Sequence, residues 1–451
     1  LSAETNTHLP RPWSLRKMNT QLTIVAVLLC VGLMALPSSA SVGTFFHLSD
    51  WHFDPFYNEN FNSDTFCRNE TELNDLTGIP IFPASLASNS IHNKDFDRRL
   101  KTSPPPHFQF GQFDCDSPQV LLETALSSML SVDANPTFII FTGDMSAHYL
   151  KLPARRSEAI SLGSLMIRES FPNTPIFPSI GNNDCYPDYF LDLPVINRPN
   201  EWLTNLWNVW STYFSIPSSQ KKDFTHGGYY VANITQSHIL LSLNTIWYST
   251  SHDPAFNTTE IPDPAGQFAW LSSQLTAARA ASLDVYIIGH ILPATGEWED
   301  AYLSTYLSIA SQFSDVITGQ LFGHTHRDTW ARLNDPVSKK LVGSYLVAPS
   351  LTPKKSNNPT FRHVFYNTTT AQLLDYDQYY ADLMNATLTG LLKFPREYNY
   401  QKVYQETSLD TPSIASAINK VSSDLILFNI WNANNDAQYN SKRADNLCAM
   451  Y

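Results

Sequence analysis

Five short segments of this 451-residue chain each place possible metal ligands directly after an apolar stretch that is typical of a buried strand. In chain order they are Asp50-Trp51-His52, Gly143-Asp144, Gly181-Asn182-Asn183-Asp184, Gly289-His290 and Gly323-His324-Thr325-His326. Strand ends of an α/β sheet converge on one edge, so ligands far apart in the sequence can share one site. The five segments together predict a site for two divalent cations.

Each segment has an ordinary explanation when it is taken alone. Gly143-Asp144 is a common turn, and His290 can be a core histidine with satisfied hydrogen bonds. A buried carboxylate after a strand is costly, however, unless it is paired or bound to metal. His324 and His326 are two residues apart, which lets both reach one ion. The order of all five segments therefore favours metal binding.

Strand and helix patterns alternate between these segments. Apolar runs predict strands at residues 42–48, 137–141, 176–180, 239–243 and 285–288. Helical patterns occur at residues 118–132, 157–169 and 266–281. Residues 57–115 are polar and rich in Pro and Asn, and they predict a long irregular segment. The end of the chain, 376–451, is expected to be mostly helical.

Residues 18–40 predict a secretory signal peptide. The apolar run of fifteen residues from Leu22 to Leu36 follows two basic residues and precedes small residues, so cleavage is expected after Ala40. A membrane anchor is the alternative, but a spanning helix needs about 20 apolar residues. No second long apolar run follows, so we expect no transmembrane segment in the mature chain and a secreted or lysosomal protein.

Glycosylation sequons and cysteines fit the secretory pathway. The five sequons begin at Asn69, Asn233, Asn257, Asn367 and Asn385. Beyond the leader the cysteines are Cys67, Cys115, Cys185 and Cys448. We expect a Cys67–Cys115 disulfide, because both fall in the irregular segment. Cys185 and Cys448 are either paired or free.

The formal net charge of −12 sets a limit on the partners. An acidic protein is not drawn to nucleic acid polymers or anionic membranes by its overall field. A negatively charged substrate must therefore be captured by a local positive centre, which bound cations would provide. We expect a monomer that acts on a small molecule.

The motifs resemble those of the calcineurin-like metallophosphoesterase superfamily and, more narrowly, those of the acid sphingomyelinase-like phosphodiesterases. The resemblance extends over nearly all of residues 43–450. It rests on the five segments and on further phrases: Cys115-Asp116-Ser117-Pro118, Leu241-Ser242-Leu243-Asn244-Thr245, Asp263-Pro264-Ala265-Gly266-Gln267, Gly319-Gln320-Leu321-Phe322-Gly323 and Val347-Ala348-Pro349-Ser350-Leu351.

The resemblance implies a four-layer α/β/β/α sandwich at residues 41–375, a helical region at 376–451 and two zinc ions, although the ligands suit other divalent metals too. It assigns one ion to Asp50, His52, Asp144 and His326, and the other to Asp144, Asn182, His290 and His324, so that Asp144 bridges them. A metal-bridging water would attack phosphorus, and His148 would donate a proton to the leaving group.

Two departures from the family pattern concern the substrate. Asn183 stands where the family usually has a second histidine, and an amide cannot act as a general acid. Proton donation would then fall on His148 alone. In addition, only about two residues separate the predicted cleavage site from the first strand, so a saposin domain like that of acid sphingomyelinase is not expected. The aromatic-rich segment 201–214 could contact lipid, although core packing is the favoured interpretation.

The expected function is hydrolysis of phosphodiester or phosphoanhydride bonds in soluble nucleotides or phosphocholine-type esters. Cleavage of sphingomyelin is one alternative, and a metal-binding pseudoenzyme, with Asn183 as a first sign of decay, is another. A purple acid phosphatase-type monoesterase would need a tyrosine three residues after the bridging carboxylate. This chain has Ala147 there, which argues against that class.

Overall fold

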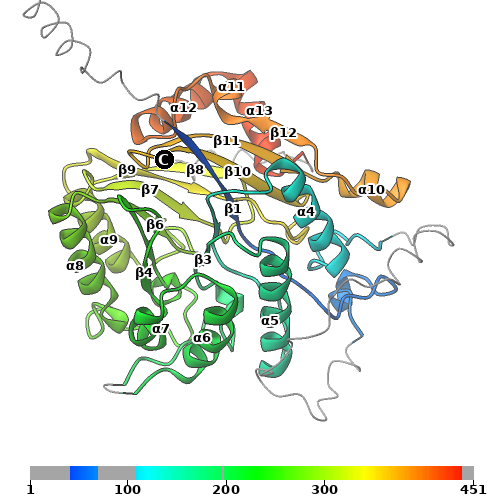
Figure 1. Cartoon of the computed structure of the whole chain (residues 1–451), viewed down its shortest axis with the longest axis horizontal. Helices are drawn as coiled ribbons and strands as arrows, with labels where there is room; N and C mark the ends of the chain where they lie inside the picture. The colour runs from blue at the N-terminus through cyan, green and yellow to red at the C-terminus, as the bar shows by residue number, and fades with distance from the viewer. Residues whose placement is uncertain (1–40, 70–107, 196–197, 439–451) are drawn as a thin grey trace, which may run out of the picture. The chain divides into compact units, whose positions relative to one another are not determined.

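The structure is a computed structural model that describes residues 41–69, 108–195 and 198–438. Two six-stranded mixed sheets form its centre (Figure 1). The first has the order β12-β11-β10-β1-β2-β3. Its strands are β1 (Val42–Leu48), β2 (Phe138–Phe141), β3 (Ile176–Pro178), β10 (Thr360–Asn367), β11 (Leu373–Tyr380) and β12 (Arg396–Asn399). β1, β2 and β3 are parallel, and β10 to β12 are antiparallel to their neighbours.

The second sheet has the order β4-β5-β6-β7-β9-β8. Its strands are β4 (Tyr230–Asn233), β5 (His238–Ser242), β6 (Asp284–Ile288), β7 (Ile317–Phe322), β8 (Thr329–Asn334) and β9 (Leu341–Val347). β5, β6, β7 and β9 run parallel to one another. Each sheet thus has parallel strands at its centre whose carboxyl ends can carry a site.

The two sheets face each other through large side chains. The rings of Phe45 in β1 and Tyr286 in β6 have their centroids 6.2 Å apart. The Tyr286 hydroxyl donates to the carbonyl of Ala371, in the turn before β11. Side chains alternate along a strand, so Phe46 points the other way and contacts Phe171 at the end of α5 (Pro153–Ser170). One face of each sheet is therefore inside the sandwich.

Helices cover the outer faces. α4 (Gln119–Val132) and α5 contact each other beside the first sheet. α8 (Gln267–Ala280) contacts β6, and Tyr306 of α9 (Asp300–Gln312) donates a hydrogen bond to Gln320 of β7. The remaining helices are α6 (Glu201–Tyr213), α7 (Lys221–Gly227), α10 (Leu383–Thr389), α11 (Tyr400–Tyr404), α12 (Thr411–Ser423) and α13 (Leu425–Asn435). Short 3-10 turns are η1 (Ser63–Thr65), η2 (Asn182–Asp184), η3 (Ser218–Gln220), η4 (Thr245–Tyr248) and η5 (Pro264–Gly266).

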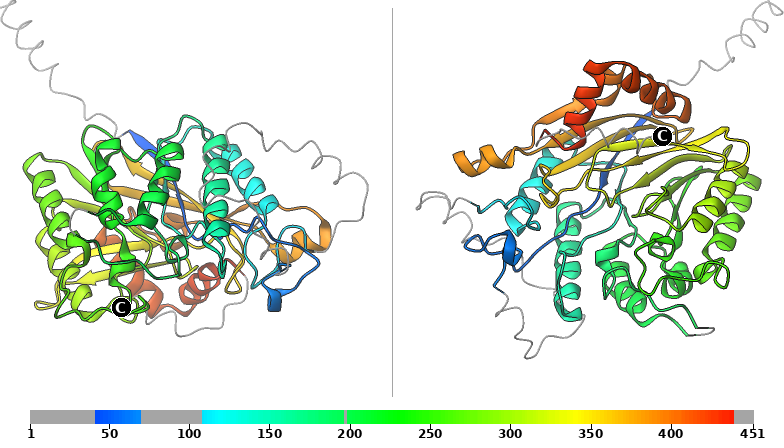
Figure 2. Two further views of the ribbon diagram at one scale, coloured as in Figure 1. Left: turned by 90° about the horizontal axis from the view of Figure 1, so that it is seen from below. Right: turned by 180° about the vertical axis from the view of Figure 1, so that it is seen from behind.

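The predicted α/β class is confirmed, with two corrections. The helix predicted to start at residue 157 begins at Pro153, because proline is favoured at the first helical position. The boundary predicted at residue 375 falls inside β11, and β12 follows it in the same sheet. The C-terminal helices, orange to red in Figure 2, contact strands of both sheets: α11 contacts β11 and β12 of the first sheet, and α12 contacts β8 and β9 of the second.

The aromatic segment of α6 packs into the core. Trp210 is fully buried, and Trp207 and Phe214 are each 5% exposed. Trp202 donates its indole N–H to the carbonyl of Asp184, at 2.8 Å. These aromatic residues hold α6 against the sandwich. Among the described residues, no helix combines the length and the apolar character required to cross a membrane.

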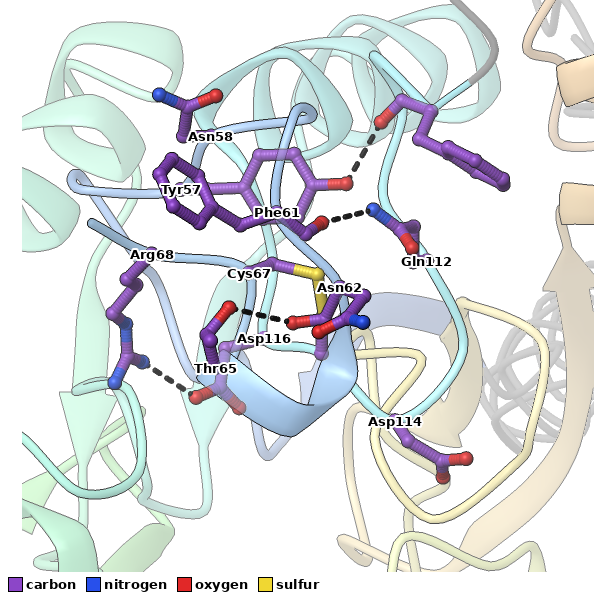
Figure 3. The surroundings of a disulfide bond; sticks show 12 residues. Tyr57, Asn58, Phe61, Asn62, Thr65, Cys67, Arg68, Gln112, Asp114 and Asp116 are labelled. Carbon is purple, nitrogen blue, oxygen red and sulfur yellow. Dashed lines mark hydrogen bonds and ion pairs between the residues drawn. A yellow bond between two sulfur atoms is a disulfide. The ribbon is translucent and has the colours of Figure 1, made fainter. Parts of the chain in front are cut away.

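Cys67 and Cys115 are joined in a disulfide, as predicted (Figure 3). Cys185 is a buried free thiol. Cys448, the predicted signal peptide and residues 439–451 lie outside the described residues. Three sequon asparagines, Asn233, Asn257 and Asn385, are exposed, and Asn69 and Asn367 are partly exposed. Their glycosylation stays a prediction.

Candidate metal centre

The predicted ligands follow the carboxyl ends of five strands. Asp50 and His52 follow β1, Asp144 follows β2, and Asn182 follows β3 in the first sheet. His290 follows β6 in the second sheet, and His324 with His326 follows β7. Because β1 to β3 are parallel, and β6 and β7 are parallel, these ends converge between the two sheets. All seven predicted ligands are brought together.

One half of the cluster joins Asp50, His52, Asp144 and His326. The His52 Nε2 atom lies 3.1 Å from His326 Nε2, 3.4 Å from Asp144 Oδ2 and 3.7 Å from Asp50 Oδ1. His326 Nε2 is 3.3 Å from Asp50 Oδ1. These four side chains are at most 2% exposed. Their donor atoms surround a single point that a cation could occupy.

The other half joins Asp144, Asn182, His290 and His324. His290 Nε2 lies 3.2 Å from Asp144 Oδ2, 3.0 Å from Asn182 Oδ1 and 3.2 Å from His324 Nδ1. Asp144 Oδ2 is therefore common to both halves, since it also approaches His52. This is the arrangement that a bridging carboxylate requires.

Backbone carbonyls fix the tautomers of three of the histidines. Nδ1 of His52 faces the Ser146 carbonyl at 3.1 Å, and Nδ1 of His290 faces that of Thr142 at 2.7 Å. Nδ1 of His326 faces the carbonyl of Lys354 at 3.3 Å. Each Nδ1 must carry the hydrogen to make these contacts, so in the neutral rings Nε2 presents a lone pair to the centre.

His324 is turned the other way. Its Nε2 lies 3.4 Å from Glu297 Oε2, and its Nδ1 faces the centre. Glu297 follows β6 in a loop and carries no motif signal of its own, so the sequence did not single it out. A carboxylate partner on the far nitrogen orients a ligating imidazole and raises its basicity.

The donor set fits two cations. Neutral His52 and His326 would point two lone pairs at each other across 3.1 Å, which is unfavourable unless a positive charge lies between them. Asp50 Oδ1 is buried, and none of the described residues donates a hydrogen bond to it. Burial and the Lys355 ammonium lower the pKa of His326 to about 3, so this imidazole is neutral, as a ligand must be.

The electrostatics of the centre also call for positive charge. Burial lowers the pKa of His290, but the carboxylates of Asp144 and Asp50 outweigh burial and raise it to about 9. The buried carboxylates therefore attract a positive charge to this point, and a divalent cation meets the same demand. Imidazole, carboxylate and amide donors together suit zinc and several other divalent metals.

Five of the ligands have an unusual backbone conformation. The φ angles are positive at Asp50 (50°), His52 (41°), Asp144 (59°), His324 (77°) and His326 (64°). The left-handed region costs a residue with a Cβ roughly 1–2 kcal/mol. Strain of this kind persists where the surrounding structure imposes it and clusters at functional sites. The strained residues are predicted ligands, which indicates that interactions elsewhere in the fold compensate for the strain and that the strained backbone orients these side chains.

His148 lies at the edge of the centre. Its ring stacks on His52, with centroids 3.8 Å apart and an interplanar angle of 20°. One of its ring nitrogens lies within 4.8 Å of ligand nitrogens of His52 and His326. The side chain is 13% exposed, so this histidine can reach a molecule bound from outside.

Asn183 faces Asp144 instead of the outside. Its backbone N–H donates to Asp144 Oδ1 at 2.7 Å, and its side-chain amide donates to Asp144 Oδ2 at 2.9 Å. Asn183 is 1% exposed. Asp184 accepts hydrogen bonds from the backbone N–H groups of Gly181, Asp144 and Met145, which ties the loops after β2 and β3 together. Both residues therefore help to fix the position of Asp144, the predicted bridging ligand.

Comparison with known proteins decides the family. Residues 43–328, more than half of the chain, match the family Calcineurin-like phosphoesterase. The chain belongs to this family. A calcineurin-like fold implies a dinuclear site for divalent metals, and the cluster described above supplies a candidate ligand set for it.

Relatives of this calcineurin-like phosphoesterase are named phosphodiesterases. Sphingomyelinase phosphodiesterase D of Dictyostelium discoideum is 31% identical over 388 residues, 84% of each chain. Cyclic GMP-AMP phosphodiesterase SMPDL3A of Bos taurus is 31% identical over 405 residues, 85% of this chain and 81% of the relative. Acid sphingomyelinase-like phosphodiesterase 3b of Homo sapiens is 26% identical over 433 residues, 91% of this chain and 87% of the relative. The protein is a phosphoric diester hydrolase of the acid sphingomyelinase-like group.

A solved structure of PhoD aligns with 81% of this chain and 71% of its own, at 10% identity and a TM-score of 0.44. The family assignment rests on the sequence match over residues 43–328.

Proposed function

We propose that this calcineurin-like phosphoesterase uses two zinc ions to hydrolyse small soluble phosphodiesters or phosphoanhydrides, such as nucleotides and phosphocholine-type esters, after entering the secretory pathway. The observation that carries the proposal is the pair of ligand sets that share Asp144 Oδ2. When bound, the cations supply Lewis acidity that activates a water and neutralises charge on the phosphoryl oxygens.

The chain's own residues divide the remaining tasks. Asp50, His52, Asp144 and His326 would hold one cation, and Asp144, Asn182, His290 and His324 the other. His148 would give a proton to the leaving oxygen from the ring nitrogen that does not contact Asp116. Asn183 would keep Asp144 in place without taking part in proton transfer.

Three observations favour soluble substrates. The relative from Bos taurus is named for cyclic GMP-AMP, a soluble nucleotide, and it matches 85% of this chain. Three of the five aromatic side chains in segment 201–214, Trp207, Trp210 and Phe214, are buried and do not form a lipid-binding surface. The net charge of −12 gives no overall attraction to anionic surfaces or nucleic acid polymers.

Sphingomyelin is the second candidate substrate, because the Dictyostelium relative is named a sphingomyelinase phosphodiesterase. The two candidates differ in their leaving group. Ceramide leaves as an alkoxide that needs a proton, whereas a nucleotide phosphate leaves with little help. If His148 is the sole proton donor, replacing Asn183 by histidine should increase turnover of alkoxide-leaving esters most. Unchanged turnover of those esters in Asn183→His would contradict this division of tasks.

The test is steady-state hydrolysis of a substrate panel by the zinc-loaded mature chain, with Asp144→Asn as the blank. The panel contains bis(4-nitrophenyl) phosphate, ATP, CDP-choline and sphingomyelin in detergent. We expect turnover of the soluble esters that disappears in the blank. Activity confined to sphingomyelin would overturn the substrate proposal. No activity at full metal occupancy would support the pseudoenzyme.

A further inference from the structure

The predicted proton donor, His148, is bound on one side to a buried carboxylate. Its Nδ1 lies 2.8 Å from Asp116 Oδ1, and its backbone N–H donates to Asp116 Oδ2 at 2.9 Å. Asp116 is 1% exposed, so its charge is largely shielded from water. A carboxylate that holds both the ring and the backbone of one histidine fixes the orientation of that ring.

Asp116 is held in turn by Arg68. The Arg68 Nη2 atom donates to Asp116 Oδ2 at 2.9 Å, and Nη1 donates to the carbonyl of His148 itself at 2.8 Å. Its Nε donates to Asp54 Oδ2 at 2.6 Å. Arg68 is 2% exposed, and its three nitrogen atoms donate to three separate acceptors in the fixed geometry of the guanidinium. Arg68 therefore contacts both Asp116 and His148.

The disulfide joins the two segments that supply these groups. Cys67 directly precedes Arg68, and Cys115 directly precedes Asp116, so the 48-residue separation in sequence is bridged next to the ion pair. Figure 3 shows the Arg68 and Asp116 side chains meeting beside the bonded sulfurs. The backbone of Asp54 adds a third connection, because its N–H donates to the carbonyl of Ser117 at 2.9 Å.

Asp116 also fixes the tautomer of His148. The His148 Nδ1 atom must carry the hydrogen that Asp116 Oδ1 accepts, so Nε2 is the ring nitrogen left to face a bound molecule. Asp54 and Asp116 are two carboxylates that share the single guanidinium of Arg68. Proton transfer to a leaving group would therefore use Nε2.

We infer that Asp116 is the positioning residue of the proton donor His148, and that Arg68 and the adjoining Cys67–Cys115 disulfide hold Asp116 in place for this purpose. The inference rests on the proposed function, in which His148 protonates the leaving group. It goes beyond that function by giving the donor a buried partner from a loop distant in sequence. The Asn183 amide is bound to Asp144, so it offers no second route for the proton.

Two phosphocholine esters separate positioning of the donor from general damage. In 4-nitrophenyl phosphocholine the leaving group departs without a proton, whereas in glycerophosphocholine an alkoxide must be protonated. We expect Asp116→Asn to lower kcat for glycerophosphocholine about 100-fold, the range for loss of general acid catalysis. For the nitrophenyl ester we expect a change of less than about threefold, with KM unchanged for both, since only the proton transfer is affected.

Matched variants sharpen the comparison. His148→Ala should reproduce the selective loss, and the double variant Asp116→Asn/His148→Ala should be no worse than His148→Ala, because the two residues act as one unit. Asp54→Asn is the control, because Asp54 binds the same arginine but does not contact His148. Any loss of kcat in this variant should be equal for the two esters. Should Asp116→Asn fold poorly, Arg68→Gln leaves the carboxylate in place and should show a smaller loss with the same selectivity.

A second readout does not depend on turnover. The ring 15N and proton resonances of His148 in the zinc-loaded chain, assigned with His148→Gln, should show a hydrogen-bonded Nδ1–H that disappears in Asp116→Asn. Equal loss on both esters in Asp116→Asn, or additive losses in the double variant, would overturn the inference. If the wild type hydrolyses neither of these esters nor any soluble ester of the substrate panel, the proposed function fails, and the resonance still decides whether Asp116 orients His148.

Discussion

Replacing Gly181 by alanine should disturb the candidate metal centre more than it disturbs the fold. A Cβ at this position would lie 2.1 Å from Asp144 Oδ1 and 2.2 Å from Asp144 N, whereas real Cβ atoms essentially never come closer than 3.0 Å. The φ angle of Gly181 is an ordinary −92°, so the conflict is steric and not conformational. The bridging carboxylate, or the loop that carries it, must therefore withdraw by about 0.9 Å.

The required shift of the Asp144 carboxylate sets the expected losses of stability and turnover. Overpacking of a well-packed site costs about 1–3 kcal/mol of unfolding free energy. A displacement of about 1 Å at a reacting centre costs about 100-fold in rate. We expect Gly181→Ala to lose turnover of bis(4-nitrophenyl) phosphate by about that factor and to bind at least one cation more weakly. Metal content after dialysis, turnover and urea unfolding measure the three quantities.

Gly266→Ala is the matched control. Gly266 has a positive φ of 67°, but a Cβ there would meet nothing within 4 Å. It should lose about 1 kcal/mol for the left-handed conformation and keep wild-type turnover. Wild-type metal affinity and turnover in Gly181→Ala would refute the reasoning, because Asp144 would then tolerate a shift that a bridging ligand cannot.

Three further predictions concern the surroundings of the site. Arg362→Met should lower the free energy of unfolding in urea by about 3–5 kcal/mol, because it leaves the buried Asp328 carboxylate, 2.5 Å from Arg362 Nη2, without a charge partner. The double variant Arg362→Met/Asp328→Asn should regain most of that stability. A loss below about 1 kcal/mol in the single variant would be evidence against a charged pair. Replacing Cys67 and Cys115 together by serine should cost about 4 kcal/mol by the chain-entropy estimate for 48 residues, and an unchanged thermal midpoint would contradict it. Burial raises the pKa of Glu397 to about 8, from a value near 4.5 in the unfolded chain. Between these two pH values the unfolded state binds fewer protons than the folded state, so stability falls as pH rises, by a few kcal/mol at most. This fall should be absent in Glu397→Gln, and identical pH profiles of unfolding for the two proteins would refute the prediction.

Local signals explain why the ligands could be predicted. At Asp50, Asp144 and His290 an apolar strand ends two or three positions before a residue that is costly to bury, and this pattern is visible in a few residues of sequence. The parallel order of β1, β2 and β3 then brings those ends together without further information. The two ligand sets and their shared Asp144 follow from these local patterns combined with the family resemblance.

Long-range partners explain what could not be predicted. The role of Glu297 depends on its contact with His324, and the role of Arg68 depends on its contact with Asp116, 48 residues further along the chain. Nothing in the sequence near Glu297 indicates its contact, and the predicted Cys67–Cys115 disulfide brings Arg68 near Asp116 without showing that the two side chains pair. β11 could not be predicted for the same reason. Two aspartates in a short run argue against a strand unless tertiary partners bind them. Asn399 binds both, donating to Asp375 Oδ2 at 2.7 Å and to Asp377 Oδ1 at 2.9 Å, which makes the strand possible.

The same reasoning applies to Asn183. The family resemblance implies that Asn183 stands where a histidine is usual, but it does not show where the asparagine side chain points. In the structure the Asn183 amide donates to Asp144 at 2.9 Å, so the residue supports the carboxylate that we propose as the bridging ligand. A sequence motif therefore identifies the position, and only the packing around it shows which atom it serves.

A metal titration shows how many bound cations the protein needs for turnover. The metal-free chain is mixed with increasing zinc, and turnover of bis(4-nitrophenyl) phosphate is recorded at each ratio of bound zinc to protein, with Asp144→Asn in parallel. We expect turnover to rise until two zinc ions are bound and to stay constant above that ratio. In Asp144→Asn we expect no turnover at any ratio. Full turnover in the chelated protein, or a maximum at one bound ion, would contradict a two-metal centre bridged by Asp144.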